Sequence, residues 1–88
     1  MKKNQGKTKS GFVYTLDPNK LDDFELLEKL AGVDDNILDL PKILVMLLGE
    51  EQKDKLYDHV RTEDGRVPIQ KVTEEIMDIF TANKEVKN

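Results

Sequence analysis

The chain has 88 residues, contains no cysteine and carries a net charge of -4 at pH 7. This length allows one small domain with a small core. The lack of cysteine excludes a disulfide framework, a thiolate metal site and a thiol nucleophile.

The longest apolar run, Ile43 to Leu48, is far shorter than the roughly 20 residues that span a bilayer. No apolar segment follows the first lysines as it would in a secretory signal. We therefore expect a cytoplasmic protein with no membrane partner.

The charge is divided unevenly along the chain. Residues 1–20 hold five lysines and one aspartate, for a net charge of +4, whereas residues 21–88 hold nine basic and 17 acidic side chains, for a net charge of -8. Because phosphate contacts need a positive surface, we expect the acidic body not to bind nucleic acid. We expect residues 1–16 to be a flexible basic arm whose first part, 1–11, is disordered and dispensable for folding. The apolar island at 12–14 fits either a strand or an extended segment laid against the core.

The first helix is expected directly after this arm. Asp17 can cap a helix, and Pro18 suits a first helical position because its missing N–H would have no partner there. The apolar spacing continues to Leu30 or Ala31 and stops at Gly32, a residue that favours helix ends.

A second helix is expected from about Asp39 or Pro41 to Gly49. Its segment Ile43–Leu48 is apolar at six consecutive positions, which cover nearly the whole circumference of a helix. Such a helix is either the central element of a fold or a binding surface.

Two more helices complete the expected fold. The third opens at Glu50 and ends before the turn at 63–66. Pro68 starts the fourth, which reaches about Ala82, and residues 83–88 form a frayed polar tail. The expected fold class is therefore all-α, a small bundle of about four helices behind a disordered basic N-terminal arm.

The helical domain at residues 17–82 should share one core. Apolar residues at helical spacing on separate segments are the candidates. They are Phe24, Leu27, Leu44, Leu48, Leu56, Ile69, Val72, Ile76 and Phe80.

The sequence offers little for catalysis or metal binding. His59 is the only histidine, and the only serine, Ser10, lies in the arm, so no nucleophile and base are expected to meet. One histidine cannot anchor a zinc site. The acidic stretch from Asp17 to Glu28 departs from a calcium loop at Asp22, where glycine is required. We expect no enzyme activity and no cofactor, catalytic or metal residues.

The apolar run of the second helix is the best functional lead. Six consecutive apolar residues exceed what one core-facing stripe requires. The alternative is a wholly buried central helix. If part of the run stays at the surface, Leu38, Val45 and Leu47 are the candidate partner-binding residues, because exposed apolar patches mark interaction sites.

Four segments carry a family resemblance. They are 23–28 (DFELLE), 40–52 (LPKILVMLLGEEQ), 56–69 (LYDHVRTEDGRVPI) and 74–80 (EEIMDIF). Across residues 20–82 the chain resembles the short tail assembly chaperones encoded by long-tailed phages and prophages of Gram-positive bacteria.

This resemblance implies a helical, non-catalytic chaperone that coats the tape-measure protein and keeps it soluble during tail morphogenesis. The tail tube protein is a further candidate partner, and self-association stays open. Such proteins act in the host cytoplasm and are absent from the mature virion. A longer form made by ribosomal frameshifting is typical. The alternative is a small helical DNA-binding or regulatory phage protein with a helix–turn–helix at 41–62, although the mixed charges of its second helix should be repelled by phosphate.

Overall fold

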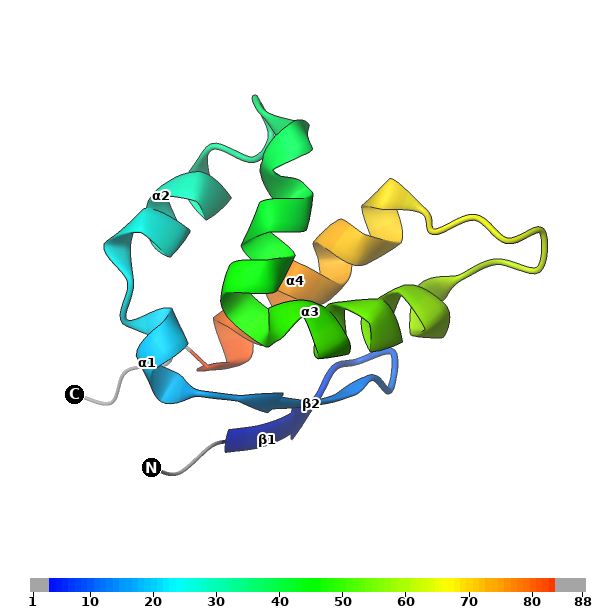
Figure 1. Ribbon diagram of the computed structural model, residues 1–88, viewed down its shortest axis with the longest axis horizontal. Coiled ribbons are helices and arrows are strands. Elements are labelled where there is room, and N and C mark those ends of the chain that lie inside the picture. Colours follow the sequence, from blue (N-terminus) through cyan, green and yellow to red (C-terminus); the bar gives the residue numbers. More distant parts are fainter. Residues whose placement is uncertain (1–3, 84–88) are drawn as a thin grey trace.

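An antiparallel hairpin followed by helices makes up the part of the chain that the computed structural model describes, residues 4–83. The hairpin packs beneath a layer of helices (Figure 1). The strands are β1 (Asn4–Lys7) and β2 (Val13–Leu16). The helices are α1 (Pro18–Leu21), α2 (Phe24–Ala31), the short 3-10 helix η1 (Ile37–Asp39), α3 (Leu40–Val60) and α4 (Ile69–Asn83).

The hairpin shows that the expected all-α fold is wrong. β1 and β2 pair in register from Asn4 opposite Leu16 to Lys7 opposite Val13. Along β2 the side chains alternate between exposed and buried, the period of a half-buried strand. Tyr14 and Leu16 therefore enter the core instead of belonging to a flexible arm.

The position of Gly6 shows how closely the two strands fit. A Cβ atom at this position would lie 2.5 Å from Oη of Tyr14, so the tyrosine side chain occupies the space that another residue would need. Oη of Tyr14 also accepts a 2.8 Å hydrogen bond from Nδ2 of Asn83, at the end of α4. The N-terminal hairpin is thus tied to the last described helix.

The expectations for the two ends of the chain can be compared with the structure only within residues 4–83. Disorder of residues 1–11 is wrong for 4–11, which form β1 and the hairpin turn. The remaining part, residues 1–3, lies outside the described residues. The frayed tail expected at 83–88 also lies outside them except for Asn83, which is the last residue of α4.

The single helix expected after Asp17 is two helices. The Asp17 carboxylate accepts a 3.0 Å hydrogen bond from the Asn19 N–H and caps α1. The Asp23 carboxylate makes the same contact with Glu25 and caps α2. A second N-cap residue within the apolar pattern therefore restarts the helix and sets a new phase for the side chains that follow.

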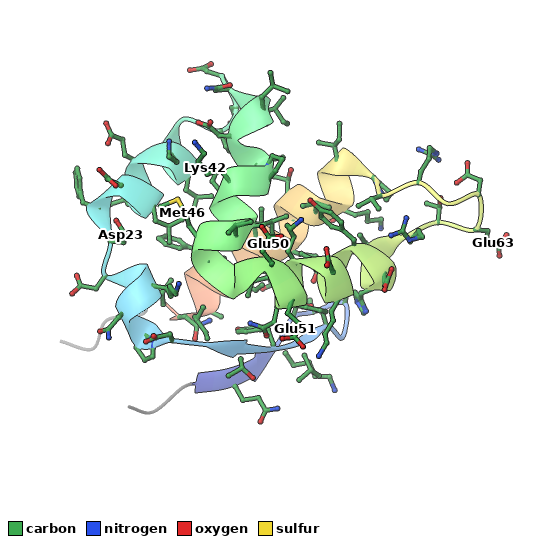
Figure 2. All side chains as sticks on the ribbon, viewed as in Figure 1. Asp23, Lys42, Met46, Glu50, Glu51 and Glu63 are labelled. Atoms are coloured by element: carbon green, nitrogen blue, oxygen red, sulfur yellow. The ribbon has the colours of Figure 1, made fainter. Side chains whose placement is uncertain are left out.

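The expected boundary at Gly49 is confirmed as a sharp kink inside α3. Gly49 has φ 85° and ψ 165°, a conformation that residues with a side chain rarely adopt. The two halves of α3 run in clearly different directions, and Glu50 and Glu51 lie just beyond the bend (Figures 1 and 2). The first half packs beside α2, and the second half lies along β2.

The core gathers buried apolar side chains from the hairpin turn, from β2 and from the three longer helices α2, α3 and α4. Its members are Phe12, Tyr14, Leu16, Leu26, Leu30, Val33, Leu40, Ile43, Leu44, Leu47, Leu48, Leu56, Val72, Ile76 and Ile79. The predicted core positions Leu44, Leu48, Leu56, Val72 and Ile76 are confirmed. Phe80 is partly buried against them.

Three of the predicted core residues are exposed. Phe24 and Leu27 are 76% and 44% exposed, and Ile69 is 62% exposed. On α2 the buried residues are Leu26 and Leu30, so the face that meets the core contains Leu26 in place of Phe24 and Leu27. The helix carries two apolar stripes, and its restart at Asp23 decides which of them faces α3.

Candidate partner-binding groove

An apolar groove of about 370 Å³ lies between η1, the start of α3 and the start of α4. Its wall and floor residues are almost all apolar. They are Ile37, Leu38, Leu40, Pro41, Leu44, Tyr57, Val67, Ile69 and Val72.

The groove combines a buried floor with exposed apolar edges. Leu44 and Val72 are buried and belong to the core, so the floor is fixed by packing. Leu38 is 85% exposed and Ile69 is 62% exposed, one on each side of the groove. Large apolar side chains with this exposure beside an apolar hollow are typical of an interaction site.

Local sequence signals set both edges. The Asp39 N–H donates to the Asn36 carbonyl over 3.0 Å, which closes the 3-10 turn that carries Ile37 and Leu38. Leu40 continues from this turn directly into α3. On the other side Pro68 lacks an N–H and precedes the first turn of α4, so Ile69 begins that helix at the rim.

The structure separates the three predicted partner-binding residues. Leu38 lines the groove. Val45 is half-buried and does not line the groove. Leu47 is only 2% exposed, so Leu47 is a core residue that a partner could not contact. The run Ile43–Leu48 is apolar all round because α2, the hairpin and α4 enclose α3 from several sides.

Sequence reasoning missed the opposite edge of the groove. Tyr57, Val67 and Ile69 come from the end of α3, the following loop and the start of α4. Ile69 is among the predicted core residues, because its spacing fits a buried stripe. The adjacent pair Ile37 and Leu38, isolated in an acidic stretch before Pro41, was the available signal for the other edge.

A polar cluster lies at the hairpin turn. Oγ of Ser10 donates to the Glu75 carboxylate over 2.7 Å and lies 3.0 Å from Nε2 of His59. In a nucleophile triad the carboxylate orients the imidazole, whereas here Glu75 binds the serine itself. The backbone N–H of Lys9 also donates to Asp78 over 2.7 Å. These contacts attach the hairpin turn to α3 and α4.

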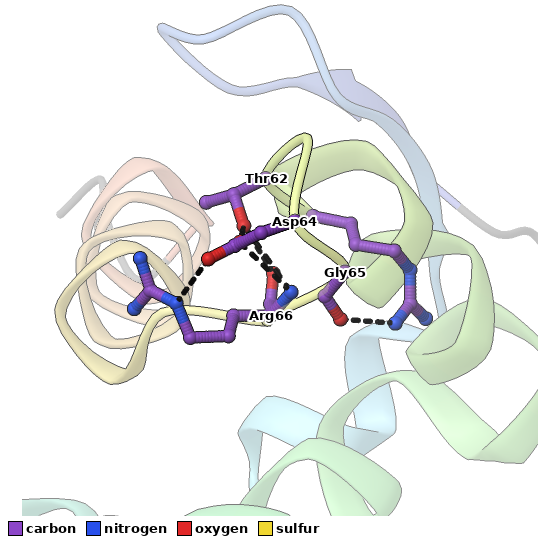
Figure 3. A network of polar contacts seen from close by, with 5 residues as sticks. Thr62, Asp64, Gly65 and Arg66 are labelled. Carbon is purple, nitrogen blue, oxygen red and sulfur yellow. Dashed lines mark hydrogen bonds and ion pairs between the residues drawn. The ribbon is translucent and has the colours of Figure 1, made fainter.

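A second polar network organises the loop between α3 and α4 (Figure 3). The Thr62 hydroxyl donates to Asp64, and Nε of Arg66 donates to the same carboxylate over 3.1 Å. Nη1 of Arg61 donates to the Gly65 carbonyl over 3.1 Å. The hydrogen bonds from Thr62 and Arg66 lower the pKa of Asp64 below its ordinary value. Glu63 lies at the tip of this loop, away from the helices (Figure 2).

The described residues also bear on metal and membrane binding. Among residues 4–83 no group of three or more histidine, cysteine, aspartate or glutamate side chains is arranged to hold a metal ion. No helix in this part of the chain combines the length and apolar character needed to cross a bilayer.

Comparisons with known proteins return no match, whether to a family model, to a curated protein or to a solved structure. The family resemblance therefore depends on the four sequence segments alone. Within the described structure the apolar groove is the feature best suited to a function.

Proposed function

We propose that this chain is a phage tail assembly chaperone that binds a helical segment of the tape-measure protein in the apolar groove. The observation that carries the proposal is the pair of exposed edges, Leu38 and Ile69, on either side of a buried apolar floor. The segments at 40–52 and 56–69, which contribute to the family resemblance, also contribute residues to this groove.

The lining of the groove favours a helix as the occupant. An extended chain would bring unpaired N–H and C=O groups against apolar side chains, where they would lose their hydrogen bonds to water. A helix satisfies its own backbone and presents side chains only. An amphipathic helix in an apolar groove is a common recognition mode.

The charge of the body suits such a role. Residues 21–88 carry a net charge of -8, and repulsion between acidic surfaces opposes association of several coated complexes. The proposed activity is binding without catalysis, in the host cytoplasm during assembly. The tail tube protein is a second candidate partner for such a non-catalytic chaperone.

Leu38→Glu tests the groove. Because Leu38 is 85% exposed, a charge there should leave the fold intact while it places an unpaired carboxylate in the interface. Loss of one buried leucine corresponds to roughly tenfold to hundredfold weaker binding. Co-expression with fragments of the tape-measure protein, followed by measurement of the soluble fragment, reports the effect.

Phe24→Glu is the matched control, since Phe24 is 76% exposed but lies on α2, outside the groove. We expect this variant to retain the fragment as the unchanged protein does. Equal retention by Leu38→Glu would place the binding surface elsewhere. If the unchanged protein keeps no fragment soluble, the chaperone proposal fails, and salt-dependent binding to duplex DNA would then favour the regulatory alternative.

A further inference from the structure

The hydrogen-bond pattern of the hairpin determines which backbone groups face outward. The Thr8 N–H donates to the Phe12 carbonyl over 2.9 Å, next to the pairing of Lys7 with Val13. Bonded and non-bonded pairs alternate in an antiparallel ladder. Gly6 and Tyr14 therefore bond to each other, whereas Gln5 and Lys7 direct their N–H and C=O groups to the outer edge of β1.

The outer edge of β2 is occupied at Thr15. The side-chain amide of Gln52, on the second half of α3, accepts from the Thr15 N–H over 2.6 Å and donates to the Thr15 carbonyl over 2.7 Å. Thr15 is the register partner of Gln5, so these two bonds confirm that this pair faces outward on both strands. Gln52 therefore supplies both bonds that a neighbouring strand would make to Thr15.

The outer edge of β1 has no such partner within residues 4–83. The sheet has only the two strands in this range, and β2 lies between β1 and α3 (Figure 1). The edge of β1 thus faces away from the helices. Unpaired edges of this kind accept an added strand.

The charge of the hairpin determines which strand fits. Residues 4–16 contain Lys7 and Lys9 and no acidic residue, and Lys2 and Lys3 precede them in the sequence. Pairing two copies through β1 would bring the lysines of both copies to one short edge, and like charges across strands are destabilising. An acidic extended segment would instead meet complementary charge.

We infer that the outer edge of β1 is a second binding site, which takes an acidic, extended segment of a partner by strand addition. The bonds would form with the backbone of Gln5 and Lys7, and the lysine side chains would select the acidic sequence. This site is separate from the apolar groove, from which residues 4–16 are absent. It can therefore be present whether or not the groove binds a tape-measure helix.

Amide exchange in the full chain tests the site directly. The probe is a blocked peptide of alternating threonine and glutamate, compared with a matched peptide that carries lysine in place of glutamate. We expect the acidic peptide to slow exchange of the Gln5 and Lys7 amides, measured by NMR. The Gly6 amide, which is already bonded to β2, should change little. Unchanged exchange at Gln5 and Lys7, or equal binding of both peptides, would overturn the inference.

A matched pair of variants separates backbone pairing from charge. Lys7→Ala removes the charge and keeps the outward N–H, whereas Lys7→Pro removes both, and proline is tolerated at an edge where the N–H points to solvent. We expect Lys7→Pro to bind the acidic peptide about fivefold more weakly than Lys7→Ala, the effect of one net hydrogen bond. Equal affinity of the two variants, with helicity preserved in both, would contradict strand addition.

Discussion

At the scale of single residues, the Gln52 side chain connects strand β2 to the kink of α3. Its amide binds both backbone groups of Thr15 on β2. Its Nε2 also donates to the Leu48 carbonyl over 3.0 Å, immediately before the kink at Gly49. One side chain thus stabilises the bend of α3 and attaches the hairpin to it. A polar residue in the polar half of a helix gives no sequence signal of this role.

Asp64 makes the loop between α3 and α4 sensitive to acid. Its pKa is lowered in the folded chain by the hydrogen bonds from Thr62 and Arg66. The unfolded carboxyl, with its ordinary pKa of 3.8, binds a proton first as the pH falls. The stabilisation is therefore complete above that value and is lost as the pH falls through the lower, folded pKa.

We expect Asp64→Asn to flatten this part of the pH profile. The urea midpoint of the unchanged protein should fall further between about pH 5 and about pH 2 than that of the variant. Glu63→Gln is the control in the same loop, since the hydrogen bonds of the network join Thr62, Asp64 and Arg66 and none of them involves Glu63. A profile of Asp64→Asn parallel to that of the unchanged protein would show that the network contributes no acid-sensitive stability.

Residue-level prediction succeeded where one apolar stripe was available. Ile76 and Leu56 are both 0% exposed, as their helical spacing predicted. It failed at Phe24, because α2 carries a second stripe through Leu26 and Leu30 that fits the core equally well. The prediction also failed at Ile69, which lies at the edge of the groove. Helical periodicity shows which face of a helix is apolar, but it does not show whether another element covers that face.

At the scale of elements, Gly49 defines the path of α3. Its φ of 85° with ψ of 165° is essentially restricted to glycine, although an added Cβ would meet no atom within 4 Å beyond its chain neighbours and the adjacent helix backbone. The strain of a side chain there would come from the backbone alone. Gly32, at the end of α2, has an ordinary negative φ of -98°.

We expect opposite outcomes for alanine at these two glycines. Gly49→Ala should lower the free energy of unfolding by about 1–3 kcal/mol, because the kink must be kept at the expense of strain. Gly32→Ala should change it by less than about 1 kcal/mol and can raise it, because alanine reduces the freedom of the unfolded chain. Chemical denaturation measures both. An unaffected Gly49→Ala variant would mean that α3 can follow another path at little cost.

The hairpin was the element that sequence patterns described least well. The island at Phe12–Tyr14 left a strand open as one possibility, but β1, with the sequence NQGK, has no apolar residue and no β-branched residue. Its pairing depends on the docking of β2 against α3 and on the close fit of Gly6 with Tyr14. Such tertiary contacts are invisible to a local pattern. The helices, in contrast, were found because caps and glycines mark their ends locally.

At the scale of the whole molecule, the first and last described elements hold each other. Lys9 contacts Asp78 and Tyr14 contacts Asn83, each pair 69 residues apart in the sequence. Between these contacts Phe12 and Leu16 fill the core from the hairpin side. A domain this small has little other apolar burial to replace them, so the hairpin is expected to be essential for stability.

Removal of residues 1–16 tests this expectation. The deletion takes away three buried apolar side chains, those of Phe12, Tyr14 and Leu16, each of which contributes about 1.5–3 kcal/mol by burial. Their sum is comparable with the whole stability of a small domain, about 5–15 kcal/mol. We therefore expect the truncated chain to lose its cooperative thermal transition in circular dichroism.

The control changes the same strand on its solvent side only. Val13→Ala and Thr15→Ala alter exposed positions of β2 and leave its buried face unchanged. We expect both variants to keep a cooperative transition, because side chains away from the core contribute little to stability. If the truncated chain melts within a few degrees of the unchanged protein, the helices alone form the folding unit and the hairpin is an accessory to it.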